Sequence, residues 1–209
     1  MVNNLVVHAL RPQDLERARD MFTERINSLE NDTNRCFYGI FEPGAPGPAF
    51  FPAIMYCFAT LDYFSSFWAG WNQRAPQGQS QTDRMVAFGE RYLLYPRKEA
   101  QIAIHFWRHK LMHTAEPRPL RDSVTDEAYC WSTGSGRQNP MQHNHMRLAP
   151  TGAKRFTLHF SPVIFVRDLH EGVFGADGYF QQLSSEEDLQ QKYRRCLAEF
   201  ESYEITLKP

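Results

Sequence analysis

Residues 50–71 read FFPAIMYCFATLDYFSSFWAGW, and Asp62 carries the only charge in this stretch. A helix of this length makes about six turns, and apolar side chains would occur nearly all around it. Pro52, Ser65 and Ser66 favour a helix buried in a soluble protein over a membrane span. We therefore expect this helix at the centre of a helical bundle or in an oligomer interface.

The chain has 209 residues, and its apolar share of 42% is sufficient for one packed domain over residues 1–209. Its formal net charge of -1 provides no overall field that would attract nucleic acid. Residues 97–121 are a local exception, because they contain six basic and two acidic side chains and so have a net charge of +4. A surface for an anionic partner is expected in this segment.

Helical spacing of apolar residues predicts further helices on both sides of the 50–71 segment. Residues 13–29 form an amphipathic pattern, and residues 30–48 have the Asn, Gly and Pro content of a loop. Thr82 is expected to cap a short helix, and residues 97–114 form a longer one before Pro117. Ser184–Glu187 resembles a capping box that opens a last helix.

Between the 97–114 helix and the last helix, the pattern changes to short runs typical of strands. These runs are residues 128–131, 145–148, 155–160 and 163–166. They predict a small antiparallel sheet within a β-rich insertion at residues 122–182. The expected fold class is therefore mainly α, a helical bundle with a small antiparallel β insertion.

The 97–114 helix carries the residues that point most directly to a reaction, Phe106-Trp-Arg-His-Lys-Leu-Met-His113. The imidazole of His113 can transfer a proton near neutral pH. The guanidinium of Arg108 can hold two phosphate oxygens at once. This pair has the chemistry needed to bind or cut a phosphodiester.

The same helix has two apolar faces. One is a core stripe of Ala100, Ala103, Ile104, Trp107 and Leu111. A second set, which lies away from that stripe, contains Ile102, Phe106 and Met112. The second face predicts a partner surface, most simply the same helix of a second copy in a homodimer. Two antiparallel copies would bring each Arg108 toward the other's His113.

The motif resembles that of the HEPN superfamily, helical bundles with an Arg, then a polar residue, and a His four to six positions after the Arg. Arg108–His113 fits this pattern with His109 as the polar residue. Relatives also have a preceding apolar helix with an acidic residue, as in Phe58–Tyr63 here. The resemblance extends over roughly residues 10–115 and leaves the β-rich segment unexplained.

The resemblance implies RNA cleavage or RNA binding without a metal or other cofactor. Arg108 would stabilise charge on the phosphate, and His113 would act as general acid or base. His109 would position the phosphate or support His113, and Asp62 would orient Arg108 or a histidine. His105 and Lys110 are further candidates for binding RNA. Many relatives are toxins or antiphage effectors, so an antitoxin partner is conceivable, and some relatives only bind.

Other interpretations of these residues remain open. A catalytically inactive interaction or sensor module would use Arg108 and His113 as favourable charges near a helix C-terminus. His105, His109 and His113 are spaced at i, i+4 and i+8, so neighbours could bind zinc. The histidines at 143 and 145 could add ligands, although histidines near a turn are more often solvated.

The cysteines and the N-terminus bear on location. Cys36, Cys57, Cys130 and Cys196 lie far apart without metal-binding spacing, which predicts reduced, mostly buried thiols. The N-terminus lacks the pattern of a signal peptide. We expect a soluble, cytoplasmic protein without a membrane anchor.

Overall fold

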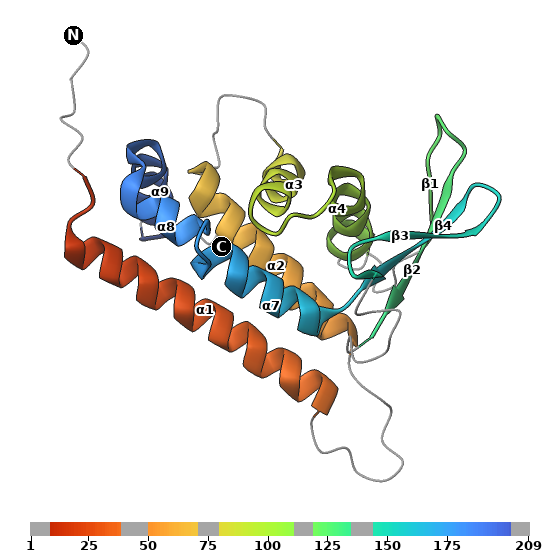
Figure 1. The fold of residues 1–209 in the computed structure, drawn as a ribbon, viewed down its shortest axis with the longest axis horizontal. Coiled ribbons are helices and arrows are strands. Elements are labelled where there is room, and N and C mark those ends of the chain that lie inside the picture. The colour runs from red at the N-terminus through yellow and green to blue at the C-terminus, as the bar shows by residue number, and fades with distance from the viewer. Residues whose placement is uncertain (1–8, 39–49, 71–79, 111–118, 135–143, 202–209) are drawn as a thin grey trace, which may run out of the picture.

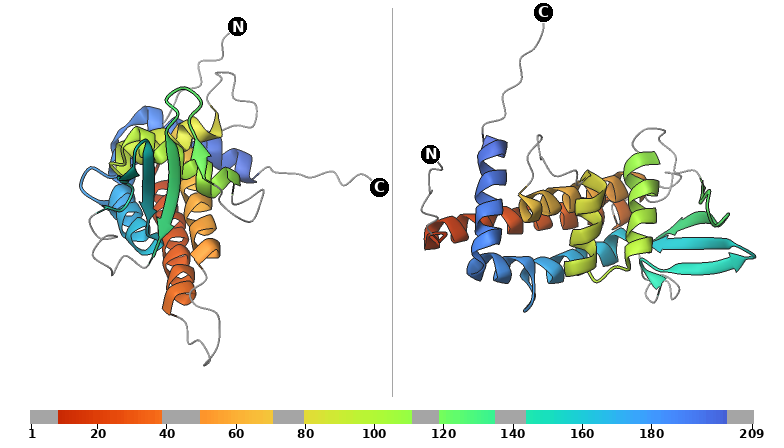
Figure 2. Two further views of the ribbon diagram at one scale, coloured as in Figure 1. Left: turned by 90° about the vertical axis from the view of Figure 1, so that its right-hand side faces the viewer. Right: turned by 90° about the horizontal axis from the view of Figure 1, so that it is seen from above.

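A computed structural model describes residues 9–38, 50–70, 80–110, 119–134 and 144–201. Its first helices are α1 (Pro12–Tyr38), α2 (Phe50–Ala69), α3 (Gln81–Tyr92), α4 (Arg97–Ala103) and the π-helix η1 (Ile104–Lys110). The strands are β1 (Leu120–Arg121), β2 (Ala128–Thr133), β3 (Leu148–Gly152) and β4 (Arg155–Phe160). The last helices are α7 (Pro162–Phe174), α8 (Tyr179–Ser185) and α9 (Glu187–Glu201). The protein is thus mainly helical with a small sheet at one end of the bundle, as Figures 1 and 2 show.

Helix α2 is the centre of the bundle. It packs against α1, α3, α7, α9 and η1, and its apolar side chains point into the core in several directions. This explains why its sequence is apolar nearly all round. Among the described helices, none combines the length and apolarity needed to cross a lipid bilayer.

An aromatic cluster joins α1, α2, α8 and α9. The Phe22 ring centroid lies 5.1 Å from that of Phe64, 5.8 Å from that of Phe67 and 5.6 Å from that of Tyr179. Tyr193 of α9 approaches the same ring at 6.1 Å. Phe22 is fully buried, so this ring ties the first helix to the last ones.

Close backbone contact fixes the end of α2 against α9. Gly70 has φ +64°, and a Cβ there would come within 2.8 Å of the Lys192 Cα. The Arg195 Nε donates a hydrogen bond of 2.8 Å to the Gly70 carbonyl. A cation thus satisfies a carbonyl group at the C-terminus of the central helix.

Helix α1 continues past the expected end at residue 29. The predicted loop at residues 30–48 is therefore wrong for residues 30–38, and residues 39–49 lie outside the described residues. Thr33 and Phe37 continue the buried stripe of the helix, with exposed fractions of 1% and 6%. Burial of these two side chains outweighs the low helix propensity of the surrounding Asn and Asp.

The cap of α3 is Ser80 rather than the expected Thr82. The Ser80 hydroxyl accepts the backbone N–H of Asp83, and the Asp83 carboxylate accepts the N–H of Ser80. This reciprocal pair is a capping box. It places Thr82 in the first turn of the helix, where its side chain is available for other contacts.

The sheet is mixed, with the order β1-β2-β4-β3, so the expectation of an antiparallel sheet is wrong for its central pair. Strand β4 forms an antiparallel hairpin with β3 and pairs on its other edge in parallel with β2. The parallel register joins Ala128 to Arg155 and Thr133 to Phe160. The segment between β2 and β3 returns the chain so that β3 runs antiparallel to β2, and the hairpin then makes β4 parallel to β2.

Strands occupy only the first part of the expected β-rich segment, up to Phe160. The strand expected at residues 163–166 is wrong, because these residues form the start of α7. The Ser161 hydroxyl accepts the N–H of Ile164, and Pro162 occupies the first turn, where it favours a helix. The Val-Ile-Phe-Val composition is typical of a strand, but capping and helical burial decide the structure.

The last helix begins later than expected. Ser184 belongs to α8, and its hydroxyl donates to the Gln181 carbonyl at 2.6 Å instead of capping α9. Helix α8 ends before Glu186, whose backbone is extended, and α9 starts at Glu187. Leu189, Tyr193 and Cys196 are buried in the core, whereas Phe200 is half exposed.

The expected 97–114 helix is described up to residue 110 and changes from α4 to the π-helix η1 at Ile104. The described part of its core stripe is buried as expected: Ala100, Ala103, Ile104 and Trp107. Ile102 and Phe106, expected on a second apolar face for a partner, are buried within this chain instead. That argument for a homodimer is therefore wrong for both residues, and Met112 lies outside the described residues.

None of the four cysteines forms a disulfide in the structure. Cys57 and Cys196 are buried, Cys36 is half-buried, and Cys130 on the sheet is exposed. The expectation of mostly buried thiols therefore fails for Cys130, because its position on β2 points away from the core side occupied by Tyr129.

Replacing Phe22 tests the aromatic cluster. Phe22→Ala should lower the free energy of unfolding by about 3–5 kcal/mol, because the cavity lies among rings that cannot collapse into it. Urea unfolding followed by tryptophan fluorescence measures this loss. Leu94→Ala, at a side chain that is 78% exposed, is the control and should change stability by less than about 0.5 kcal/mol. Equal effects of the two substitutions would contradict this account of the core.

Candidate functional site

The carboxylate of Asp62 is the only charged group that α2 carries, and it gathers polar side chains from α3 and η1. The Gln81 amide donates a hydrogen bond to Asp62 Oδ2. Arg84 Nη2 lies 3.7 Å from Asp62 Oδ1, and Arg108 Nη2 lies 3.8 Å from Asp62 Oδ2. We call these four residues the Asp62 cluster. An acidic residue in the central helix thus holds two arginines that are distant in sequence.

Burial and charge act against each other in this cluster. Burial raises the pKa of Asp62, although the Arg108 and Arg84 guanidinium groups counteract the rise. Burial also lowers the pKa of Arg84, whose side chain is only 5% exposed, while Asp62 counteracts that fall. Arg108 is 24% exposed and therefore forms the part of the cluster that a ligand can reach.

Two histidines of η1 continue this polar surface toward α3. The His109 Nε2 lies 3.0 Å from the Thr82 hydroxyl, so one of the two donates a hydrogen bond to the other. The rings of His105 and His109 have centroids 5.2 Å apart. His105 is exposed, whereas His109 is half-buried against α3. The histidines and Arg108 therefore share one helix but contact different neighbours.

The structure brings together part of the set that the sequence singled out. Asp62 contacts Arg108, and His105 contacts His109. His113 and the side chain of Lys110 lie outside the described residues. The relation of Arg108 to His113, on which the sequence motif depends, is therefore still a prediction.

Metal binding would need more ligands than the described residues provide at one place. No group of three or more His, Cys, Asp or Glu side chains with metal-binding geometry occurs among residues 9–38, 50–70, 80–110, 119–134 and 144–201. The His105 and His109 pair offers two imidazoles. His143 lies outside the described residues, and the ring nitrogens of His145 are engaged within the protein.

A second polar cluster, not expected from the sequence, connects α7 with the segments just before α4 and β3. His145 Nδ1 accepts the Ser161 backbone N–H at 2.9 Å. Its Nε2 lies 3.1 Å from the Tyr95 hydroxyl, which donates to Asp168 Oδ2 at 3.2 Å. The His145 side chain is 5% exposed, so the expectation of a solvated histidine is wrong for this residue.

The protonation state of this cluster follows from its hydrogen bonds. Nδ1 accepts a hydrogen bond from the Ser161 N–H, so the neutral imidazole carries its proton on Nε2. Burial is the main cause that lowers the pKa of His145 to about 3, and Arg167 adds to it. Burial raises the pKa of Asp168, partly offset by Arg167. No local sequence pattern signals this network, since its members come from three distant segments.

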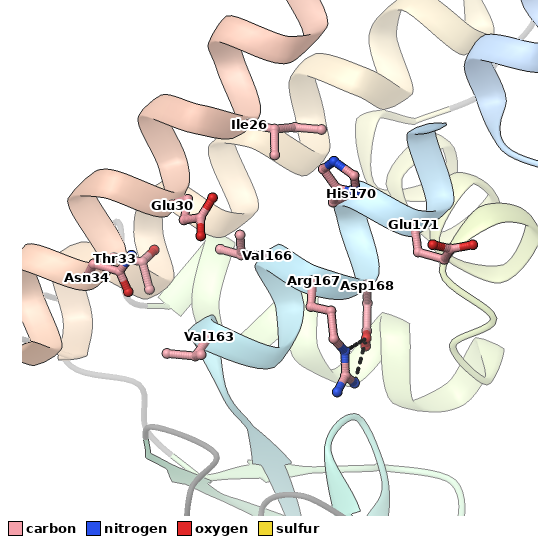
Figure 3. Close-up of a pocket in the computed structure, with 10 residues that line it drawn as sticks. All are labelled: Ile26, Glu30, Thr33, Asn34, Val163, Val166, Arg167, Asp168, His170 and Glu171. Atoms are coloured by element: carbon pink, nitrogen blue, oxygen red, sulfur yellow. Dashed lines mark hydrogen bonds and ion pairs between the residues drawn. The ribbon is translucent and has the colours of Figure 1, made fainter. Parts of the chain in front are cut away.

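Asp168 also faces a pocket of about 590 Å³ between α1 and α7, here called the α1–α7 pocket. Figure 3 shows α1 residues Ile26, Glu30, Thr33 and Asn34 opposite α7 residues that include the Arg167–Asp168 ion pair. Thr33 is 1% exposed, and its hydroxyl has no partner among the described residues. The pocket is separate from the Asp62 cluster.

Comparison with protein-family models, with curated proteins and with solved structures gave no match for this chain. The residues themselves are therefore the basis for any assignment of function.

The buried histidine predicts a specific pH dependence of stability. The folded pKa of about 3 lies below the ordinary value of 6.5, so between these values only the unfolded chain binds the proton. Stability from neutral His145 is complete above pH 6.5 and is lost as the pH falls toward 3. The stability deficit of His145→Gln relative to wild type should therefore shrink by about 2 kcal/mol between pH 7 and pH 5.

Urea unfolding at the two pH values measures this deficit, and His170→Gln, at an exposed histidine of α7, is the matched control. A deficit of His145→Gln that stays the same at both pH values contradicts a neutral buried imidazole. An equal change in His170→Gln would show that burial at residue 145 is not its cause.

Proposed function

We propose that the protein binds RNA through Arg108 and cleaves it with His113, as a HEPN-like endoribonuclease that needs no metal. The observation that carries this proposal is the contact between Arg108 and Asp62, because it holds a partly exposed guanidinium in place beside two histidines. The function is inferred from this geometry together with the Arg108–His113 sequence motif.

The charge of the Asp62 cluster favours an anionic ligand. Two guanidinium groups share at most one negative charge there, so the cluster has a positive excess. Arg84 is buried, which leaves Arg108 as the group that an RNA phosphate would neutralise. Arg108 and Asp62 lie 3.8 Å apart, which is longer than a hydrogen bond. The N–H donors of Arg108 can therefore bind phosphate oxygens.

The proposed reaction uses the 2′-hydroxyl of the RNA as nucleophile. Its oxygen attacks the adjacent phosphorus, and the bond to the 5′-oxygen of the next nucleotide breaks, which leaves a 2′,3′-cyclic phosphate. His113 removes the proton from the 2′-hydroxyl or protonates the leaving 5′-oxygen, and water takes up or supplies the other proton. Arg108 stabilises the charge that builds on the non-bridging oxygens.

The other candidates have supporting roles in this proposal. Asp62 orients Arg108 through their contact at 3.8 Å. His109, hydrogen-bonded to Thr82, positions the phosphate or His113, while His105 and Lys110 extend the binding surface. The proposed setting is a cytoplasmic toxin–antitoxin, antiphage or stress response, with an antitoxin as possible partner.

RNA cleavage tests the proposal directly. Purified protein should cut single-stranded RNA in the presence of EDTA. Arg108→Ala and His113→Ala should each slow cleavage by roughly 10²-fold or more, the scale for loss of charge stabilisation or proton transfer. Arg97→Ala is the matched control, because Arg97 is an exposed arginine of the same segment, paired with Glu90 at 2.6 Å. It should cut RNA at the wild-type rate.

Equal rates in wild type and both variants would point to a contaminating nuclease and reject the site. Folded protein that binds RNA through Arg108 but never cuts it would favour the alternative function, a catalytically inactive interaction module.

We further propose that the active form is a homodimer, in which the η1 segments of two copies approach each other. With Ile102 and Phe106 buried, the polar side chains Arg108 and His105 would form this interface rather than an apolar face. Light scattering should give twice the monomer mass at micromolar concentration, and more completely at high salt than at low salt, because the interface brings two positively charged clusters together and salt screens their repulsion. A monomer under both conditions would contradict the dimer.

A further inference from the structure

A pocket of about 500 Å³ lies where α3, α4 and the sheet meet, beside the Asp62 cluster. We call it the α3–sheet pocket. Its walls include Thr82 from α3, Gln101 and His105 from the α4–η1 segment, and Tyr129 from β2. It is therefore built from segments on both sides of the junction between bundle and sheet.

Packing against the core fixes the apolar side of this pocket. Ile102 and Tyr129 are 8% and 4% exposed. The Tyr129 ring stacks on Phe156 with centroids 5.9 Å apart, and Lys98 Nζ lies 5.4 Å from the centroid of the Tyr129 ring. Lys98 is also bonded to Glu127 at 2.8 Å. This wall is thus preformed, and its lysine is held in place.

Two other polar side chains of the pocket keep their hydrogen-bonding groups available. Gln101 and His105 are exposed, and neither has a hydrogen-bond partner among the described residues. The rim carboxylates differ, since Asp83 accepts from Ser80 and Asp122 accepts the N–H groups of Val124 and Thr125. An incoming ligand would therefore meet an amide and an imidazole first.

His109 connects the pocket with the proposed phosphate site. Thr82 lines the pocket and is hydrogen-bonded to His109, the residue after Arg108. His105 lines the pocket and packs its ring against His109. Two lining residues thus contact the immediate neighbour of Arg108 in the chain.

We propose that the α3–sheet pocket binds the nucleobase attached to the phosphate held by Arg108, and that it prefers adenine. This inference rests on the proposed function and deepens it by naming the recognised base. The imidazole of His105 provides a ring for base stacking, as single-stranded RNA recognition commonly uses. The Gln101 amide presents one donor and one acceptor side by side, and such an amide can bond N6 and N7 of adenine as it does when glutamine reads this base in a duplex.

Binding of uncleavable oligonucleotides tests the proposal. The probes are fluorescein-labelled 2′-fluoro oligomers of adenine, uracil or cytosine, and an oligomer of the same length without bases. They lack the attacking hydroxyl and stay intact. Full-length wild-type protein should bind the adenine oligomer at least about tenfold more tightly than the uracil oligomer, the scale for one two-bond base contact. Both should bind more tightly than the abasic oligomer.

Gln101→Ala should lose the preference for adenine and keep wild-type affinity for the abasic oligomer, since Gln101 is exposed and does not belong to the Asp62 cluster. Gln181→Ala, at an exposed glutamine of α8, is the matched control and should keep the preference. Arg108→Ala should weaken all oligomers, including the abasic one.

The outcomes distinguish failure of the base pocket from failure of the proposed function. If Arg108→Ala weakens all oligomers but Gln101→Ala keeps the wild-type preference, the base pocket is wrong and the phosphate site stands. Equal binding of adenine and abasic oligomers by wild type also overturns the base pocket alone. If no oligomer binds, or binding does not depend on Arg108, the proposed function fails, and the base pocket fails with it.

Discussion

A single carboxylate in an otherwise apolar helix constrains much of this molecule. Helix α2 is surrounded by helices, so Asp62 can remain there only with partners for its charge. The partners come from α3 and η1, which explains why these two helices lie side by side against α2. The same pairing makes the two arginines unequal, because Arg84 is enclosed while Arg108 keeps an accessible edge.

This constraint links stability to the proposed chemistry. The ion pair at 3.8 Å keeps the Arg108 guanidinium near Asp62 without occupying its N–H donors, which stay available to phosphate oxygens. The Thr82 hydroxyl likewise restrains the His109 ring through their hydrogen bond of 3.0 Å. Since Ser80 takes over the capping of α3, Thr82 is left to make that contact. The capping of α3 by Ser80 thus leaves Thr82 free to position a side chain of η1.

The sequence predicted the features that depend on local periodicity. The central position of α2 and the buried side of α4 follow from apolar spacing, and the structure confirms both. Strand pairing could not be predicted, because β4 pairs with β3 in a hairpin and with β2 in parallel, and composition specifies neither the order of the strands nor their direction. Of the candidate site, the resemblance implied that Asp62 orients Arg108 or a histidine, and the structure shows Asp62 in contact with Arg108. The Tyr95–His145–Asp168 network was missed because three distant segments supply it.

The cluster around Phe22 has a consequence for synthesis on the ribosome. Its rings come from the first helix and from the last two, and the Leu10 N–H is bonded to Gln190 at 2.7 Å. Helix α2 therefore leaves the exit tunnel long before α7 and α9 exist to cover it. Until these helices have been synthesised, a strongly apolar segment lacks its partners, which is the condition that recruits chaperones. The bundle can close only after α9 has left the ribosome.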